Sequence, residues 1–282
     1  MFLRGYILFL ICCTLIFPQQ NFDSYKNYKN SSFSNTIKND ALESFNISLN
    51  LLQSPLHFDN NDMIMAGIVL TMTGAAFSVD NKIRTDVSKI QSKSFDDITY
   101  YGEKFGRPVY ASILSGLLYT TGYFISDDYI KETGQILAET MICTGLLTQL
   151  LKITLGRARP FTGSPNTDID PFEFEFESED NSLPSGHTSI AFSIATVLSQ
   201  RINNPYVSFA LYSMASLTAY QRIYSDDHWL SDTILGAALG TFIGLKIVKL
   251  HENNSPEEQR FSLNVFPQIN PRSYGVGFAL QF

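Results

Sequence analysis

Residues 220–232, YQRIYSDDHWLSD, combine an arginine, a histidine and a carboxylate at spacings that suit phosphate chemistry. If the chain is helical from His228 onward, Asp232 lies one turn away on the same face. A carboxylate placed there can hold one imidazole nitrogen as a donor and leave the other free to attack. Arg222 supplies a forked cation that suits phosphate oxygens. A histidine one turn from an aspartate is more often structural than catalytic, so the interpretation depends on other segments.

A pair of cations stands in residues 151–160, LKITLGRARP. Lys152 and Arg159 are seven residues apart, about two helical turns, so both can lie on one helix face. Pro160 ends a helix near Arg159, and Arg157 is expected to face elsewhere. Two cations at a helix end could hold an anion, although basic helix ends are commonly just solvated.

The tetrapeptide PSGH, residues 184–187, precedes an apolar segment that is expected to be helical. The backbone N–H groups of Ser185 and Gly186 at a helix N-terminus would form an anion site, and the Ser185 hydroxyl could add a donor. His187 would then stand beside the anion, where a general acid belongs. The alternative is a serine N-cap with a histidine close by.

Combined, these segments provide three cations, two hydroxyl or backbone donors and two histidines. Phosphoryl transfer needs charge stabilisation on the equatorial oxygens and an in-line nucleophile and leaving group. His228, oriented by Asp232, could attack phosphorus to give a phosphohistidine that water hydrolyses, and His187 could protonate the leaving oxygen. Three fixed cations make a metal ion unnecessary, so no cofactor is expected. A zinc site built from both histidines and the aspartate is the alternative.

The three segments resemble the signature of the type 2 phosphatidic acid phosphatase superfamily. This group includes membrane lipid phosphatases, soluble bacterial acid phosphatases and vanadium haloperoxidases. Its signature is a Lys, six residues and Arg-Pro; then PSGH; then Ser-Arg, five residues, His, three residues and Asp. The chain matches the signature at Lys152, Arg159, Pro160, Pro184, Ser185, Gly186, His187, Arg222, His228 and Asp232. Gln221 stands where the family usually has Ser.

The resemblance covers roughly residues 63–250 and implies a role for each matching side chain. The phosphate ligands would be Lys152, Arg159, Ser185, Gly186 and Arg222. By the same resemblance His228 is the nucleophile, His187 the general acid and Asp232 the residue that orients the nucleophile. It also implies an all-α bundle with the site at one end of its helices.

Six apolar segments rich in Gly, Ala, Ser and Thr must position these residues. They are residues 63–79, 108–126, 134–151, 188–200, 205–221 and 233–245. Because strand-like alternation is absent from them, we predict an all-α fold. It is a six-helix bundle of the acid phosphatase/vanadium haloperoxidase type, with a small C-terminal β-hairpin.

The chain is predicted to have four parts. They are a signal peptide at 1–20, a polar Asn/Ser-rich tail or linker at 21–62, a phosphatase helical domain at 63–252 and the hairpin at 253–282. The signal peptide is expected because Arg4 precedes an uncharged apolar run of 13 residues.

The apolar segments leave the relation to a membrane open. A span needs about 20 apolar residues, and three of the six segments are much shorter between charges. An exported N-terminus followed by three spans would also place residues 156–187 in the cytoplasm. We therefore favour an exported, periplasmic bundle of the cell envelope that contacts a membrane, with an integral membrane protein as the alternative.

These features predict a metal-independent phosphatase that acts on a lipid phosphate, such as phosphatidic acid, polyprenyl diphosphate or a lipid A phosphate. A soluble acid phosphatase acting on small phosphoesters, a vanadate-dependent haloperoxidase and a non-catalytic phospholipid-binding envelope protein are the alternatives. The formal net charge of −7 argues against nucleic acid as a partner, and no protein partner is indicated.

Overall fold

The computed structural model describes residues 33–172, 181–254, 262–270 and 273–281. The chain divides into two compact units, residues 1–54 and 55–282, which are described separately. The predicted signal peptide at residues 1–20 lies outside the described residues. In the first unit, helix α2 (Phe33–Gln53) lies within residues 21–62, the predicted tail or linker, in which a short amphipathic helix at 41–52 was expected.

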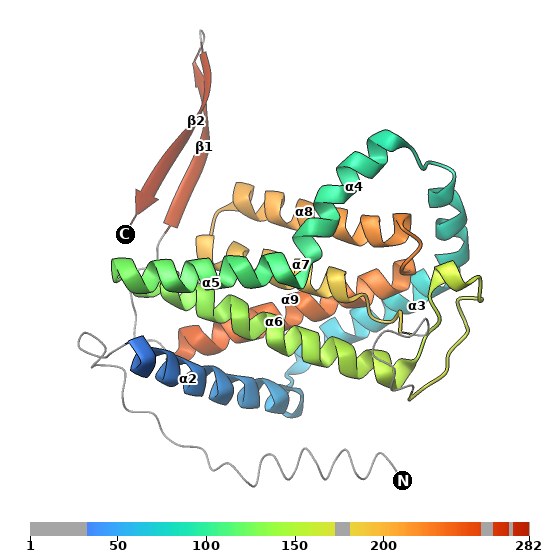
Figure 1. The fold of residues 1–282 in the computed structure, drawn as a ribbon, viewed down its shortest axis with the longest axis horizontal. Coiled ribbons are helices and arrows are strands. Elements are labelled where there is room, and N and C mark those ends of the chain that lie inside the picture. Colours follow the sequence, from blue (N-terminus) through green and yellow to red (C-terminus); the bar gives the residue numbers. More distant parts are fainter. Residues whose placement is uncertain (1–32, 173–180, 255–261, 271–272, 282) are drawn as a thin grey trace. The chain divides into compact units, whose positions relative to one another are not determined.

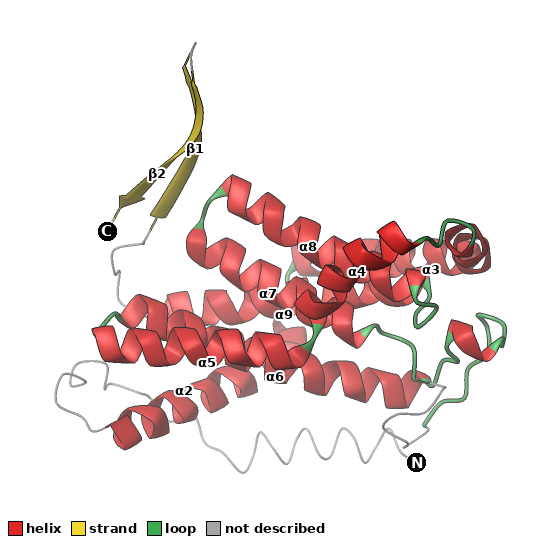
Figure 2. Ribbon diagram, turned by 45° about the horizontal axis from the view of Figure 1, so that its top comes forward, coloured by secondary structure: helices red, strands yellow, loops and turns green. Residues whose placement is uncertain are grey.

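The second unit is a bundle of long helices (Figures 1 and 2). The helices are α3 (Asn60–Ser88), α4 (Lys93–Gly106), α5 (Pro108–Ile125), α6 (Asp128–Leu155), α7 (Gly186–Ile202), α8 (Pro205–Tyr224) and α9 (Leu230–Asn254). Two short 3-10 helices, Ser54–His57 and Pro160–Thr162, complete the described helical elements.

The sequence predicted six helices for this unit, one fewer than its described part contains. Each predicted apolar segment lies within a helix, apart from Ser126 just after the end of α5, but the described part of the unit has a seventh helix, α4. Its sequence, KSFDDITYYGEKFG, alternates charged and aromatic residues and contains no long apolar run. A search for apolar segments therefore missed it, although its helical amphipathic pattern is strong.

Helix α7 lies at the centre of the bundle and packs against α6, α8 and α9, while α5 packs on α6 and α4 on α8. Glycines allow α7 and α9 to approach closely. A Cβ atom on Gly240 would come within 2.1 Å of the Ser189 carbonyl oxygen, and one on Gly236 within 2.7 Å of the Ser185 carbonyl oxygen. These two glycines share one face of α9. The contact fixes the start of α7 against the start of α9, which are the segments that carry PSGH and Asp232.

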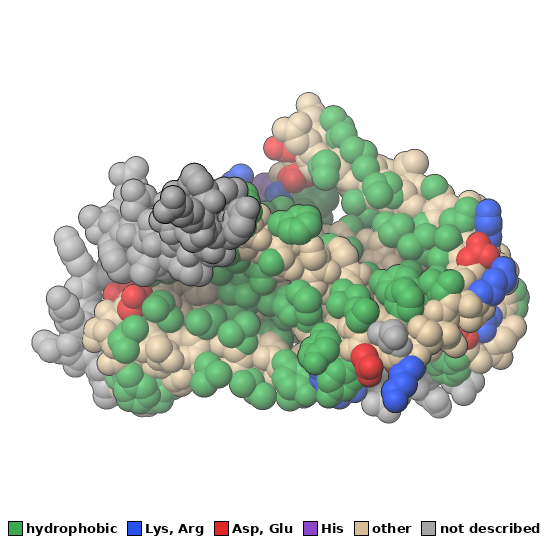
Figure 3. Space-filling model, turned by 90° about the horizontal axis from the view of Figure 1, so that it is seen from above, with side chains coloured by type: hydrophobic (Ala, Val, Ile, Leu, Met, Phe, Trp, Pro, Cys, Tyr) green, Lys and Arg blue, Asp and Glu red, His purple; other side chains and the backbone are tan. Residues whose placement is uncertain are grey.

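Among the described residues, three helices, α3, α6 and α9, are by length and composition apolar enough to cross a membrane. The first has large apolar side chains on its surface, including Met63, Ile64, Met65, Ile68, Leu70 and Met72. Apolar side chains also cover much of the face seen in Figure 3. Such extended apolar surface is typical of a membrane contact and unusual for a soluble bundle. The chain is therefore a membrane-associated or integral protein.

This finding agrees with the predicted membrane contact and adds support to the alternative of an integral membrane protein. The apolar runs in the sequence stop at Glu139 and at Lys246, whereas α6 and α9 continue to 28 and 25 residues. Distances between charges therefore underestimated the helix lengths. A helix of about 20 residues spans the 30 Å hydrocarbon core of a bilayer.

Two strands pair near the C-terminus. Strand β1 (Ser262–Asn270) runs antiparallel to β2 (Ser273–Gln281), with Ser262 opposite Gln281. The two residues that connect them lie outside the described part of the chain.

Candidate active site

His228 and Asp232 lie at the start of α9, in a geometry that the helix itself explains. The sequence suggested that the helix begins at His228. It begins at Leu230, so His228 lies just before its first turn. Asp232 Oδ2 accepts a hydrogen bond from the backbone N–H of Trp229 at 2.9 Å, which is half of a capping box. The same oxygen lies 3.5 Å from His228 Nδ1, and both side chains are buried. The aspartate thus faces one ring nitrogen and leaves Nε2 for the site.

Two residues that the sequence analysis did not select hold Asp232 in place. The guanidinium of Arg157 donates from Nη1 to Asp232 Oδ1 at 2.5 Å and from Nη2 to Asp80 Oδ2 at 2.7 Å. All three side chains are inaccessible to solvent. Asp80, on α3, also accepts hydrogen bonds from the backbone N–H and hydroxyl of Ser231. Arg157 therefore faces these two carboxylates, and it braces the one behind His228.

Lys152 and Arg159 do not share a helix face, contrary to the prediction. Helix α6 ends at Leu155 because Gly156 adopts a left-handed conformation with φ of 54°. A side chain at this position would also collide with the Asp170 carbonyl oxygen, so the backbone requires glycine. Lys152 lies in the last turn of α6 and donates to the Asn181 carbonyl oxygen, whereas Arg159 follows in the chain that leaves the helix.

The third cation, Arg222, lies in the last turn of α8 and is largely buried. Its Nη2 atom is 2.7 Å from Asp227 Oδ2, and Arg159 Nη1 is 4.0 Å from Asp227 Oδ1. The two arginines that were predicted to bind phosphate therefore meet at one carboxylate.

The PSGH segment forms the start of α7, as predicted. Ser185 occupies the N-cap position, but its side chain makes no capping hydrogen bond and instead lies 2.9 Å from the Thr188 hydroxyl. Its backbone N–H donates to the Asp232 carbonyl oxygen at 3.0 Å. A Cβ atom built on Gly186 would lie 4.0 Å from Lys152 Cε. The N-terminus of α7 is thus joined to the Asp232 segment and lies against Lys152.

Both histidines lie outside the three candidate spans and are neutral in the free protein at pH 7. Burial, together with the neighbouring Arg222 guanidinium, lowers the pKa of His187 to about 4. Burial and the charges of Lys152, Arg222 and Arg159 hold the pKa of His228 well below its ordinary value of 6.5. These mutual effects place the three cations and the two histidines in one cluster.

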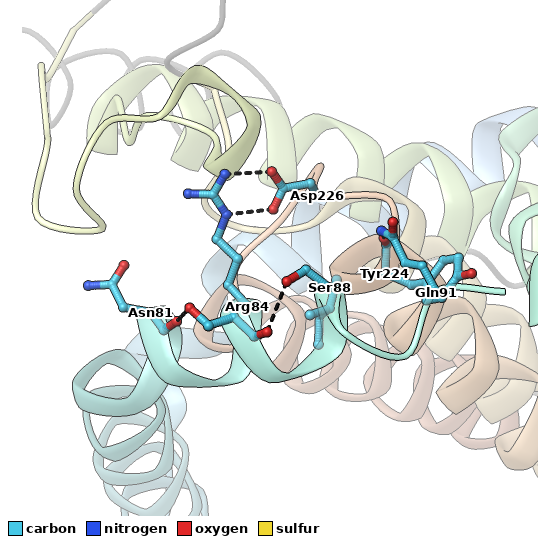
Figure 4. A pocket seen from close by; sticks show the side chains of 8 residues that line it. Asn81, Arg84, Ser88, Gln91, Tyr224 and Asp226 are labelled. Atoms are coloured by element: carbon cyan, nitrogen blue, oxygen red, sulfur yellow. Dashed lines mark hydrogen bonds and ion pairs between the residues drawn. The ribbon is translucent and has the colours of Figure 1, made fainter.

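A polar pocket of about 480 Å³ lies beside the loop before His228 (Figure 4). Arg84 on α3 crosses it and forms two hydrogen bonds with Asp226, at 2.7 and 2.6 Å. None of the predicted phosphate ligands lines it. Within the described ranges, no group of three His, Cys, Asp or Glu side chains is arranged to hold a metal ion.

Comparison with known proteins agrees with this architecture. Residues 134–256 match the model of the PAP2 superfamily. The solved PAP2-type phosphatidylglycerolphosphate phosphatase of Bacillus subtilis superposes with a TM-score of 0.53 at 19% identity, over 68% of this chain and 96% of that one. This chain and that structure therefore share a helical fold. Residues 134–256 include all three motifs, so the similarity to the PAP2 superfamily lies in the part of the chain that carries them.

Two curated relatives come from Porphyromonas gingivalis. A lipid A 1-phosphatase is 46% identical over 66 residues, which is 23% of this chain and 15% of that protein. A lipid A 4'-phosphatase is 27% identical over 118 residues, which is 42% of this chain and 50% of that protein. The chain thus spans half or less of the length of these relatives.

The brace behind Asp232 leads to a prediction about stability. Replacing Arg157 with Met should lower the free energy of unfolding by about 3–5 kcal/mol, because two buried carboxylates lose their shared countercharge. Thermal unfolding of the detergent-solubilised chain measures the effect. Arg84→Met is the matched control, since its partly exposed pair with Asp226 should contribute about 1 kcal/mol or less. Equal melting temperatures for the two variants would contradict the buried brace.

Proposed function

We propose that the chain is a metal-independent phosphatase that removes a phosphate group from a membrane lipid. The observation that carries the proposal is the position of one cluster, in which His228, with the Asp232 carboxylate 3.5 Å from its Nδ1 atom, lies among Lys152, Arg159 and Arg222. This cluster lies at the end of helices whose outer surface is apolar. A substrate with a phosphate head and acyl chains fits both features.

The proposed reaction has two steps. His228 Nε2 attacks phosphorus, the bond to the lipid oxygen breaks, and His187 gives its proton to that oxygen. The phosphate oxygens are held by the three cations, by the Ser185 hydroxyl and by the Gly186 N–H at the N-terminus of α7, since the Ser185 N–H is bonded to Asp232. Water then attacks the phosphohistidine, with His187 as the base that takes its proton, and inorganic phosphate leaves.

A lipid A phosphate is the substrate that we propose first, because the curated relatives are named for that lipid. Their names specify two different phosphate positions, so the class of lipid is proposed and not the position. Phosphatidic acid and polyprenyl diphosphate share the same two features, a phosphate or diphosphate group and an apolar chain. A soluble aryl phosphate lacks the apolar chain and serves as the reference.

The test is phosphate release by the purified full-length chain in detergent and excess EDTA, with lipid A, phosphatidic acid, polyprenyl diphosphate and nitrophenyl phosphate. We expect a lipid substrate to have a kcat/KM at least about tenfold above that of the aryl phosphate, since the apolar chain adds binding energy. Preference for the aryl phosphate would favour the soluble acid phosphatase alternative. Activity that EDTA abolishes would contradict the metal-independent mechanism.

We further propose that residues 63–252 form the catalytic domain and that the site faces the periplasm. The site lies at the C-terminal end of α3, whereas Asn60 lies at the other end. If α3 spans the membrane, a site on the periplasmic side requires Asn60 to be cytoplasmic. A cleaved signal peptide would instead place Asn60 in the periplasm and the site in the cytoplasm. A cysteine placed at Thr162 beside the site, in a background in which Cys12, Cys13 and Cys143 are replaced by Ser, should react with a membrane-impermeant maleimide in whole cells. Reaction only after lysis would place the site inside.

A further inference from the structure

Asp227, the residue before His228, lies where its carboxylate contacts two of the proposed phosphate ligands. Its Oδ2 atom is 2.7 Å from Arg222 Nη2 and its Oδ1 atom is 4.0 Å from Arg159 Nη1. The Ser225 hydroxyl donates a hydrogen bond to the same Oδ2 atom. A carboxylate presents oxygens to a guanidinium much as a phosphate does, so this side chain is an anion inside the proposed phosphate site.

The neighbouring acid, Asp226, has a different partner. It adopts a left-handed conformation with φ of 61°, which aspartate tolerates better than most residues. Its carboxylate pairs with Arg84 on α3 and lines the adjacent pocket (Figure 4). Two successive carboxylates of equal charge thus serve two different sets of cations, and only the second faces the catalytic cluster.

The contacts of Arg222 show that Asp227 is its main partner in the free protein. Its Nη1 atom makes a weak hydrogen bond of 3.3 Å to Gln221, and its buried Nε atom has no hydrogen-bond partner among the described residues. The short contact with Asp227 is therefore the strong interaction that Arg222 makes in the free protein. A phosphate that binds Arg222 through the same nitrogen must displace this carboxylate or share the arginine with it.

We infer that Asp227 is an internal competitor for the phosphate site, which weakens the affinity for inorganic phosphate and so speeds its release. The inference rests on the proposed function, because it takes Arg159 and Arg222 as phosphate ligands. When the phosphohistidine is hydrolysed, the product is a free dianion held by three cations, and such a product would otherwise leave slowly. The Asp227 carboxylate returns to Arg222 as the phosphate departs and repels it from the site.

The experiment compares two variants that each remove one negative charge at adjacent positions, Asp227→Asn and Asp226→Asn. The dissociation constant of inorganic phosphate is measured by isothermal titration calorimetry on the full-length chain in detergent and EDTA. The inhibition constant of phosphate against nitrophenyl phosphate is measured in parallel. We expect both constants to fall about tenfold in Asp227→Asn and to stay within twofold of wild type in Asp226→Asn. Asp227→Glu, which keeps the charge, should remain near wild type.

Unchanged or weaker phosphate binding in Asp227→Asn would overturn the inference. An equal gain in Asp226→Asn would also overturn it, because the effect would then come from net charge and not from the contact with Arg222. Asp227→Ser serves as a second variant if the asparagine protein melts at a lower temperature. Calorimetry needs no turnover, so it tests this inference even in a chain that hydrolyses no ester. Phosphate binding without hydrolysis would refute the proposed function alone.

Discussion

Replacing His228 by Ala should reduce phosphate release from the preferred lipid by about 10⁴-fold or more. The residue is the proposed nucleophile, and removal of a covalent nucleophile leaves only the catalysis that binding and charge stabilisation provide. The phosphate ligands remain in this variant, so KM should change by less than about threefold. The loss would therefore lie almost entirely in kcat. Initial rates in EDTA over a range of substrate concentrations measure both constants.

A matched control distinguishes loss of chemistry from loss of structure. His57, which is exposed in the short helix Ser54–His57, can be replaced by Ala in the same preparation. That variant should retain activity within about twofold of wild type. Inorganic phosphate should still bind to the His228→Ala protein. Activity in His228→Ala above about a tenth of wild type would exclude the histidine as nucleophile.

The second large effect concerns His187 and depends on pH and on the leaving group. As a general acid this residue must be protonated, and its pKa in the free protein is about 4. The protonated fraction therefore falls about tenfold per pH unit above that value, and kcat/KM for the lipid should fall with it. His228 must be neutral to attack, and its depressed pKa keeps it neutral over this range. A bound phosphate dianion favours protonated His187, so the decline of kcat should begin at a higher pH.

The variant His187→Gln should lose about 10²- to 10³-fold in kcat on the lipid substrate, whose alkoxide is a poor leaving group. Nitrophenyl phosphate has a far better leaving group and needs less protonation, so its kcat should fall less than about tenfold. The decline of kcat/KM at rising pH should also disappear in the variant. Rate profiles of both proteins between pH 4 and 9 test these expectations. Equal losses on the two substrates would remove His187 from the role of acid.

The motif residues could be found from the sequence because their spacing is local. The separation of His228 and Asp232 predicts that they meet, and their side chains lie 3.5 Å apart although the helix starts at Leu230. The PSGH segment likewise predicts a helix start near His187 or Thr188, and the helix begins at Gly186. In these two segments chain geometry decides which groups are neighbours, whereas the helix that carries Lys152 ends before Arg159.

The brace of Asp80, Arg157 and Asp232 could not be predicted in this way. Its members lie on α3, after α6 and on α9, and 75 or more residues separate Arg157 from each carboxylate. Local periodicity carries no information about such contacts. The one available signal was Asp80 itself, a lone charge at the end of a long apolar run, which requires a partner once buried.

The relation to the membrane and the role of Asp227 also depend on tertiary structure. The length of an apolar run does not say which side chains remain exposed after packing, and it is the exposed face of α3 that points to a lipid contact. In the sequence, Asp226 and Asp227 are equivalent acids. Only the left-handed turn at Asp226 directs the two carboxylates to Arg84 and to Arg222.

Trapping of a covalent intermediate tests the central claim most directly. The full-length protein would be mixed with a ³²P-labelled lipid phosphate, quenched in alkali within milliseconds and digested for peptide mapping. We predict a label that is stable in alkali and lost in acid, carried by the peptide that contains His228 and absent from the His228→Ala protein. A label on any other residue, or one that persists in the His228→Ala protein, would contradict the phosphohistidine mechanism.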